Sequence, residues 1–417
     1  MSLCATGLSL LSAGVVYATA PPAGAAFTGS NGPIAFVSTR ANGGSFGGIF
    51  EVNSQASGLG SASGDQAATS GLTNGGSGAG IDAEPFFSPS GSEVFFSSNR
   101  DAAGVWAIYG ISQGSPEPPG SPTELSQVSG SETNDDYAQS VASDGRTVVF
   151  NRNGSSLDTL DAGAANPAST VCTLYTPAVG LAAVNTDGGT SRALFNPVDP
   201  TKLLYIGGDG HLHLVTGLPA PSATAPTNPC GAVAGQAGVV DTDLSAKAID
   251  SLTSAVDTTG TYQDENPDWS PDGTEVVFDS TRGGTNHTLW VMTNIASGTT
   301  TVTPLWPTQV GSAGGTRKST TEPVVSPDGT YVAFVEPGQG VNTWTGLIVG
   351  MNQGLSNAQD VSLSTQGNGI VNDQPDWGPS QPGTGTPEVP LPILLPGSAL
   401  VIGGLAVLVE RRRRPAH

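Results

Sequence analysis

A turn followed by a short apolar strand recurs along this chain, at intervals much longer than a helical or hairpin repeat. Ser270–Gly273 (Ser-Pro-Asp-Gly) precedes Val276–Phe278, and Ser326–Gly329 (again Ser-Pro-Asp-Gly) precedes Val332–Phe334. In such a turn Pro presets φ, Asp bonds locally and Gly closes the fourth position, while β-branched and aromatic residues favour a buried strand. The spacing predicts an all-β protein built from repeated sheets.

Three further copies of the unit are present. Ser88–Gly91 precedes Val94–Phe96, and Ser143–Gly145 precedes Val148–Phe150. The gap between Gly145 and Gly273 is more than twice as long as the spacing of the other neighbouring copies. A degenerate copy, Asn196–Pro200 followed by Leu203–Tyr205, fills it.

The two ends of the repeat region are complementary halves of one unit. Pro33–Phe36 and Ile49–Val52 resemble later strands without a leading turn, whereas Asp373–Gly378 resembles a leading segment without later strands. If the last segment completes the first sheet, the ring closes and no long strand edge stays exposed. Five whole units and one split unit predict a six-bladed β-propeller with split-blade closure, in which Trp377 lies near Phe36. The turn and closure residues are Pro271, Asp272, Gly273, Pro327, Asp328, Gly329 and Trp377.

The best-preserved copy carries a family resemblance. Pro267–Gly273, Val276–Arg282 and Leu289–Met292 together resemble the WD-like repeat of TolB-type β-propellers. The resemblance covers most of residues 31 to 379 and implies a propeller fold.

A Ser-x-Arg triplet follows several of the predicted strands. It occurs at Ser38–Arg40, Ser98–Arg100 and Ser280–Arg282. We expect each arginine to play a structural part by pairing with the acidic turn of a neighbouring blade.

The composition fits all-β structure and excludes nucleic acid as a partner. Only 12% of the residues are charged, and the 58 glycines and 32 prolines gather in turns and interblade loops. The formal net charge is −21, and four of the fourteen basic residues are Arg411–Arg414. Phosphate binding requires clustered Lys and Arg, which the repeat region lacks.

The two ends of the sequence predict export and membrane anchoring. Residues 1–26 resemble a secretory signal peptide, with an apolar stretch followed by small residues, although the basic n-region is missing. Residues 391–410 form an apolar stretch long enough to cross a bilayer as a helix, and the basic tail 411–417 follows. By the positive-inside tendency the arginines stay inside and the propeller, residues 27–380, lies outside the cytoplasm.

A Pro/Gly-rich linker, residues 381–390, connects the propeller to this anchor. The order of Pro-rich motif, apolar stretch and Arg cluster resembles bacterial surface-sorting tails of the PEP-CTERM and LPxTG kinds, although neither motif is met in full.

Three cysteines occur, and removal of Cys4 with the leader leaves Cys172 and Cys230. Outside the cytoplasm such a pair is a disulfide candidate. The alternative is two thiols in adjacent blades that lie too far apart to be bridged.

We assign no catalytic, cofactor-binding or metal-binding residues from the sequence. Gly110–Gly114 matches G-x-S-x-G, but the proline-rich segment after it excludes the helix that a nucleophile elbow needs. His211 and His213 share one face of a strand, a spacing compatible with two metal ligands, and we interpret the segment as an outer strand with its polar face in water. The carboxylate pairs Asp241/Asp243 and Asp264/Glu265 are interpreted as solvated loops.

One insertion interrupts the repeats between the fourth and fifth blades. Its apolar positions between Asp243 and Val256 predict a short amphipathic helix.

Together these patterns favour a noncatalytic, envelope-anchored propeller that binds another envelope protein or a cell-wall polymer. The alternative is a hydrolase or lyase acting on peptides or polysaccharides, with carboxylates from several blades converging in the channel. A cluster of Asp, Glu or His with perturbed titration at one end of the channel would favour that alternative.

Overall fold

The structure is a computed structural model, which describes eighteen stretches of the chain. They are residues 29–39, 47–54, 69–73, 80–101, 104–113, 122–127, 133–182, 192–221, 230, 237–251, 254, 261–284, 286–297, 299–305, 321–337, 345–351, 359–360 and 372–381. The predicted signal-peptide segment 1–26, the anchor 391–410 and the tail 411–417 lie outside these residues, as does most of the linker 381–390.

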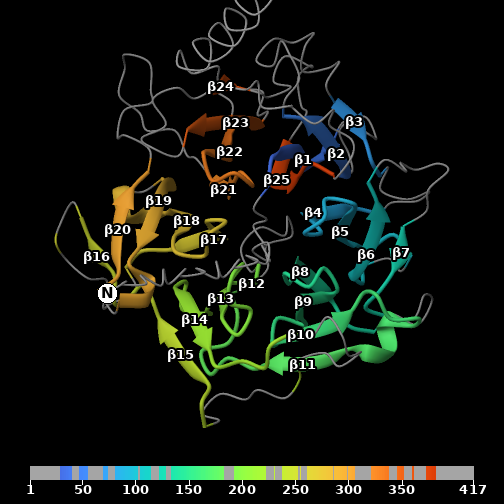
Figure 1. Cartoon of the computed structure of the whole chain (residues 1–417), viewed down its shortest axis with the longest axis horizontal. Helices are drawn as coiled ribbons and strands as arrows, with labels where there is room; N and C mark the ends of the chain where they lie inside the picture. Colours follow the sequence, from blue (N-terminus) through green and yellow to red (C-terminus); the bar gives the residue numbers. More distant parts are fainter. Residues whose placement is uncertain are drawn as a thin grey trace, which may run out of the picture.

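The described strands pair into six sheets arranged around a common centre (Figure 1). The first sheet has the order β25-β1-β2-β3, with β25 (Asn372–Pro379), β1 (Asn31–Ser38), β2 (Gly48–Asn53) and β3 (Thr69–Gly71). The second contains β4 (Asp82–Phe87), β5 (Glu93–Ser98), β6 (Ala107–Ser112) and β7 (Thr123–Glu124). The third contains β8 (Asp136–Val141), β9 (Thr147–Arg152), β10 (Ser156–Asp161) and β11 (Cys172–Tyr175).

The remaining sheets follow in chain order. The fourth contains β12 (Leu194–Phe195), β13 (Leu203–Ile206), β14 (Leu212–Thr216) and β15 (Val240–Asp243). The fifth contains β16 (Ile249–Asp250), β17 (Asp264–Trp269), β18 (Val276–Ser280), β19 (Thr288–Thr293) and β20 (Thr301–Pro304). The sixth contains β21 (Thr321–Val325), β22 (Tyr331–Pro337), β23 (Thr345–Met351) and β24 (Gln359–Asp360). The described 3-10 helices are η2 (Pro167–Thr170), η3 (Thr281–Gly283) and η4 (Ile295–Ser297).

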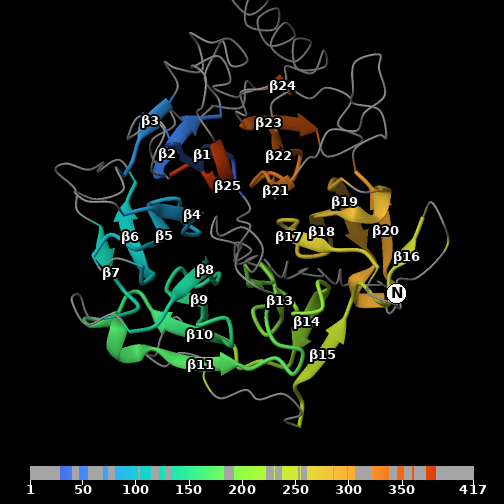
Figure 2. The same cartoon turned by 180° about the vertical axis from the view of Figure 1, so that it is seen from behind.

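The all-β propeller architecture is confirmed, and so is the split first sheet. Strand β25 pairs antiparallel with β1, with Ile34 opposite Trp377. The indole N–H of Trp377 donates to the Gly32 carbonyl at 3.2 Å. The inner strands of all six sheets face the centre when the molecule is seen from either side (Figure 2).

The sheets do not all have the same number of strands. Five of the sheets have four strands, whereas the sheet of β17–β20 has a fifth. Its additional strand, β16, pairs parallel with β20. In the described part of the segment after Asp243, a turn at residues 244–248 leads into β16, so the amphipathic helix predicted there is wrong for these residues.

The core lies between neighbouring sheets. The second strand of each sheet contributes at least one aromatic side chain with no exposed surface, namely Phe36, Phe95 and Phe96, Phe150, Tyr205, Phe278 and Phe334. Ile34 and Phe36 of β1 pack in one apolar cluster with Val324 and Ala333 of the sixth sheet. Burial of such a side chain contributes about 1.5–3 kcal/mol, so the interfaces between sheets carry much of the stability.

The recurring turns are built as the sequence predicts. The Gly273 N–H donates to the Ser270 carbonyl at 2.8 Å, and the Asp272 carboxylate accepts the Ser270 hydroxyl at 2.6 Å. Gly273 has φ +68°, and a Cβ there would lie 2.6 Å from Oδ1 of Asn196 in the preceding sheet. Glycine is therefore required both by the backbone and by the close approach of the neighbouring sheet.

The described arginines of the Ser-x-Arg triplets pair within their own sheet, not with the turn of a neighbouring blade. Arg100 bonds Asp82 at 2.7 Å and Arg282 bonds Asp264 at 2.6 Å, and in each case the aspartate begins the innermost strand. Arg40 lies outside the described residues.

A hydroxyl from the preceding sheet joins each of these ion pairs. Ser245 donates to Asp264 at 2.6 Å and accepts the Leu212 N–H at 2.9 Å. Thr73 makes the equivalent pair of bonds to Asp82 and to the N–H of Ile49. The ion pairs therefore tie adjacent sheets together.

Within the described residues, no helix has the length and apolar character needed to span a membrane. The segment predicted to do so, residues 391–410, is not among them.

Candidate functional site

A pocket opens where the innermost strands meet at the propeller axis. It encloses about 340 Å³ of space, part of which is open to solvent. It is lined by residues of four inner strands and by one arginine from the segment before β12, namely Glu84, Asn266, Pro267, Glu322, Pro323, Val324, Gln374, Pro375 and Arg192.

Four of these lining residues occupy one structural position. Glu84, Asn266, Glu322 and Gln374 each precede a proline and have φ between +48° and +55°. The strand register shifts at this point in each of their sheets. A non-glycine residue in the left-handed region costs of order 1–3 kcal/mol and is found most often at functional sites. The bulges therefore mark this ring of side chains as a candidate binding surface.

Three of these four bulges are fixed by a side chain of the neighbouring sheet. Gln374 Oε1 accepts the Glu84 N–H at 2.7 Å, and Glu322 Oε2 accepts the Gln374 N–H at 2.6 Å. Asp279 Oδ2 accepts the Glu322 N–H at 2.9 Å. The pocket rim is therefore held by hydrogen bonds that run from sheet to sheet.

Two aspartates near the axis make the same kind of contact. Asp268 Oδ2 accepts the Val325 N–H, and Asp376 Oδ2 accepts the Phe87 N–H, both at 2.7 Å. Burial raises the pKa of Asp268 to about 7 and that of Asp376 to about 6. The charge of Arg192 and the backbone N–H donors oppose these two increases.

Arg192 brings a positive charge to this acidic surface. Its guanidinium lies 5.4 Å from the centre of the Phe86 ring and donates to the Pro85 carbonyl at 3.3 Å. These contacts hold the guanidinium beside Glu84, in the wall of the pocket.

Next to the pocket, a histidine joins a group of carboxylates. His287 Nδ1 lies 2.6 Å from Asp279 Oδ1 and 3.8 Å from Glu265 Oε2. The pKa of Glu322 is raised well above its usual range, first by burial of its carboxyl group and then by the charge and hydrogen bond of Asp373. The channel therefore holds carboxylates with perturbed pKa values, as the enzyme alternative predicts.

His211 and His213 lie elsewhere, around β14 (Leu212–Thr216). His211 and His213 are each only 4% exposed, so their interpretation as the wet face of an outer strand is wrong. Asp241 and Asp243, interpreted as loop residues, lie in β15, which pairs with β14. Each contacts one of the histidines: His211 Nδ1 is 2.8 Å from Asp243, and His213 Nδ1 is 3.2 Å from Asp241.

The pair Asp264/Glu265, also interpreted as a solvated loop, begins strand β17, and Asp264 is fully buried. In the G-x-S-x-G segment, Ser112 is the exposed last residue of β6, and Gly114 lies outside the described residues.

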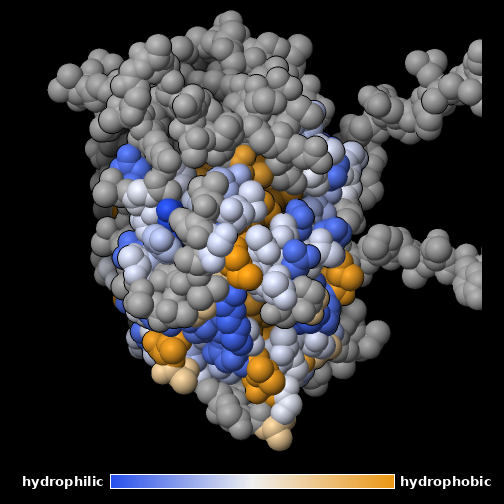
Figure 3. Space-filling view, turned by 90° about the vertical axis from the view of Figure 1, so that its left-hand side faces the viewer, coloured by the Kyte–Doolittle hydropathy of each residue, from blue (hydrophilic) through white to orange (hydrophobic). Residues whose placement is uncertain are grey.

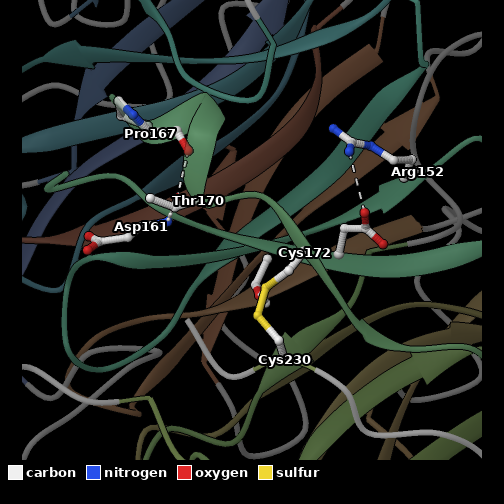
Figure 4. The surroundings of a disulfide bond; sticks show 8 residues. Arg152, Asp161, Pro167, Thr170, Cys172 and Cys230 are labelled. Atoms are coloured by element: carbon white, nitrogen blue, oxygen red, sulfur yellow. Dashed lines mark hydrogen bonds and ion pairs between the residues drawn. A yellow bond between two sulfur atoms is a disulfide. The ribbon is translucent and has the colours of Figure 1, made fainter. Parts of the chain in front are cut away.

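Cys172 and Cys230 are joined by a disulfide (Figure 4). Their Cα atoms are 5.8 Å apart, and the bond closes a sequence separation of 58 residues. It attaches Cys230, which lies between β14 and β15 in the sequence, to β11 of the third sheet. The bond therefore links the third and fourth sheets covalently.

The flank that carries the five-stranded sheet shows several separate hydrophobic patches among hydrophilic side chains (Figure 3). The exposed large hydrophobic residues among those described are Val179, Val198, Val240, Ile249 and Tyr331. Scattered apolar residues of this kind are ordinary on a protein surface, so they do not mark a docking face.

The fold and the site define a closed β-propeller with an acidic, arginine-bearing pocket on its axis. The sequence matches no protein-family model and no curated protein. Among solved structures the chain is similar to TolB from Acinetobacter baumannii, with 14% identity, coverage of 84% of this chain and 67% of that chain, and a TM-score of 0.51. At this identity the likeness establishes the shared TolB-type propeller fold.

Two further structures overlap less closely. A putative TolB from Agrobacterium tumefaciens is 14% identical over 84% of this chain and 99% of that chain, with a TM-score of 0.44. An oligogalacturonate lyase in complex with manganese is 12% identical over 78% of this chain and 84% of that chain, with a TM-score of 0.35.

Sequence reasoning missed the pocket residues, although a signal was present. A polar residue precedes proline at the same place in four units, as Glu84-Pro85, Asn266-Pro267, Glu322-Pro323 and Gln374-Pro375. The residue before proline usually adopts extended backbone, so nothing local indicates the left-handed bulge that aligns these side chains.

Proposed function

We propose that this protein is a noncatalytic binding scaffold of the cell envelope, and that the axial pocket receives a positively charged group of its partner. The partner is an envelope protein or a cell-wall polymer. The observation that carries the proposal is the alignment of Glu84, Glu322, Asn266 and Gln374 at equivalent strained positions around one pocket. The net charge of −21 favours a cationic ligand over an anionic one.

The hydrogen bonds of the axial acids support binding over catalysis. Asp268, Asp376 and Asp279 each use a carboxylate oxygen to accept a backbone N–H of the neighbouring sheet. A general acid or base has to exchange its proton with a substrate, whereas these oxygens are committed to holding sheets together.

The proposal includes export and anchoring through residues 391–410, with the propeller outside the cytoplasm. It rests on the apolar stretch and the arginines that follow it. Protease added to spheroplasts should cleave the propeller while leaving Arg411–Arg414 protected. Protection of the propeller until the spheroplasts are lysed would contradict this placement.

Binding is tested with the full chain and labelled peptides that carry Lys and Arg, against analogues that carry Glu and Asp, followed by fluorescence anisotropy. We expect saturable binding of the basic peptides that weakens as salt rises. Glu84→Gln should weaken it, because this change removes an acidic group from the pocket. The matched control is Glu275→Gln, which changes a carboxylate beside the Ser270–Gly273 turn and should leave binding unchanged.

Equal peptide binding by wild type and Glu84→Gln would refute the proposed site. Affinity capture from membrane and wall extracts, with the full chain as bait, then identifies the natural partner. Thermal denaturation of each variant establishes that the fold is retained.

The alternative function, a hydrolase or lyase acting on peptides or polysaccharides, is favoured by one observation. Glu322 has a strongly raised pKa and lies beside Asp279, which contacts His287. A carboxyl group whose pKa is raised by burial is suited to general acid catalysis. Turnover of a peptide or polysaccharide library that is lost in both Glu322→Gln and His287→Gln would replace the scaffold by this enzyme.

A further inference from the structure

A second cluster of ligand-type side chains lies in the fourth sheet, apart from the axial pocket. Asp209 is in the turn between β13 and β14, His211 directly precedes β14, and Asp243 ends β15. Each of the three offers one ligand atom, and these atoms all lie within 4.8 Å of one another. Strand pairing produces this convergence, because His213 of β14 is opposite Asp243 in the register of β15.

The carboxylates of the cluster are oriented by backbone donors. Asp243 Oδ1 accepts the Ala246 N–H at 2.8 Å, and its Oδ2 lies 2.8 Å from His211 Nδ1. Asp209 Oδ1 accepts the His211 N–H at 3.2 Å. Each carboxylate is therefore held in place with an oxygen facing the cluster.

A second layer of side chains supports Asp209. His213 Nε2 lies 3.1 Å from Asp209 Oδ2, and His213 Nδ1 lies 3.2 Å from Asp241 Oδ1. Asp241 Oδ2 in turn accepts the hydroxyls of Tyr205 at 2.6 Å and Tyr175 at 2.9 Å. Metal-binding carboxylates are commonly oriented by such outer partners.

The charges of the cluster favour a cation. Three aspartates surround two imidazoles, and each of the two histidines is 4% exposed. Carboxylates brought this close repel one another unless protons on the imidazoles or a bound cation compensate their charge. The Asp209 side chain is 35% exposed, which gives an ion a route from solvent.

We propose that Asp209, His211 and Asp243 bind a divalent transition-metal ion, with Zn²⁺ the best match to one imidazole and two carboxylates. His213 and Asp241 position Asp209 without binding the ion themselves. Calcium is disfavoured, because it takes oxygen ligands rather than imidazole nitrogen.

The second His-carboxylate group provides a matched control. Glu265, Asp279 and His287 also place ligand atoms within 4.8 Å of one another. However, Asp279 Oδ2 already accepts both the Asn266 amide and the Glu322 N–H. That oxygen is engaged by two donors, so His287→Gln should leave zinc binding unchanged.

The test uses the full chain, stripped with a chelator and titrated with ZnCl₂ against a chromophoric competitor. We expect His211→Gln to lose one equivalent of bound zinc relative to wild type and to His287→Gln. Asp209→Asn changes an exposed turn residue with little risk to the fold and should weaken binding at least tenfold. His213→Gln should weaken it by about 10–100-fold, as changes to outer partners do.

Two further readouts make the result independent of stability. Co²⁺ should give visible absorption bands in wild type that disappear in His211→Gln, and excess Ca²⁺ should not displace the zinc. The proposal is overturned if His211→Gln and Asp209→Asn bind as much zinc as wild type does, or if wild type itself binds no zinc. The cluster is then a set of imidazolium–carboxylate ion pairs.

Discussion

The carboxylate of Asp376 accepts the backbone N–H of Phe87 at 2.7 Å, so the strand that completes the first sheet is also fixed to the second. Asp268 makes the same contact to Val325, from the fifth sheet to the sixth. Both aspartates belong to a Pro-Asp-Trp segment of an innermost strand. One short segment therefore provides the connection between neighbouring blades at two places in the ring.

The buried carboxyl of Asp376 makes stability depend on pH. Its pKa is raised to about 6, whereas an unfolded aspartate titrates near 3.9. The folded chain therefore binds more protons than the unfolded chain between these values, and stability falls as pH rises from about 4 to 6. The contribution of Asp376 to this loss is up to about 3 kcal/mol.

Thermal denaturation at several pH values between 4 and 8 measures this effect. Asp376→Asn should reduce the pH dependence in that window. The control is Asp328→Asn, which removes a carboxylate of the Ser326–Gly329 turn. Hydrogen bonds from Ser326 and Thr330 lower the pKa of Asp328 against the effect of burial. This substitution should therefore change the pH dependence of stability only at lower pH. A pH profile that is identical in Asp376→Asn and wild type would contradict the assignment.

The Arg282–Asp264 ion pair should be among the most sensitive contacts of the molecule. Both side chains have no exposed surface, and they lie 2.6 Å apart. Removal of one partner of a buried pair leaves an uncompensated charge and costs about 3–5 kcal/mol. Urea denaturation of Arg282→Ala should show this loss. Lys202→Ala breaks an exposed pair with Asp199 and should cost less than about 1 kcal/mol. Similar losses in the two variants would contradict the role of the buried pair.

Replacement of Gly273 by alanine should disturb the contact between the fourth and fifth sheets. Gly273 and Gly180 both have positive φ, but a Cβ at Gly273 would meet Asn196 at 2.6 Å, whereas a Cβ at Gly180 has nothing within 4 Å. Gly180→Ala measures the backbone cost alone, about 1–2 kcal/mol. Gly273→Ala should cost measurably more in urea denaturation, and the excess should couple to Asn196→Ala in a double-mutant cycle. Equal costs at the two glycines would show that the sheets adjust freely.

The Cys172–Cys230 disulfide should contribute strongly to stability. Closure of a loop of this length is worth about 4 kcal/mol in the chain-entropy model. Cys172→Ser/Cys230→Ser should therefore melt at a lower temperature than oxidised wild type, and a reductant should lower the melting temperature of wild type alone. Thiol titration of the denatured protein should count the pair as oxidised. A reductant that leaves the melting temperature unchanged would contradict this contribution.

The repeated unit was predictable because its signals are local. Pro271, Asp272 and Gly273 specify a turn by their own backbone preferences, and Phe278 follows in the strand that the turn begins. The complementary end segments also predict the pairing of Trp377 with the first sheet, because each end lacks the strands that the other supplies.

The errors arose where contacts depend on three-dimensional register. Arg282 was expected to pair with the acidic turn of a neighbouring blade. Its partner is instead Asp264 of its own sheet, and the sequence alone does not show that these two residues lie at the same end of paired strands. Strand β16 exists because it pairs with β20, some fifty residues further along the chain. His211 meets Asp243 only through the pairing of β14 with β15, so neither the burial of this histidine nor its partner follows from spacing alone.

The bond between Trp377 and Gly32 spans 345 residues, which affects how the protein is made. At roughly 5–20 residues per second, translation needs about 17–70 s to deliver the tryptophan after the glycine has emerged. Throughout that interval β1 lacks the neighbour that covers its inner edge. The earliest blade to be synthesised is consequently the last to be finished, because its sheet waits for the final strand of the repeat region.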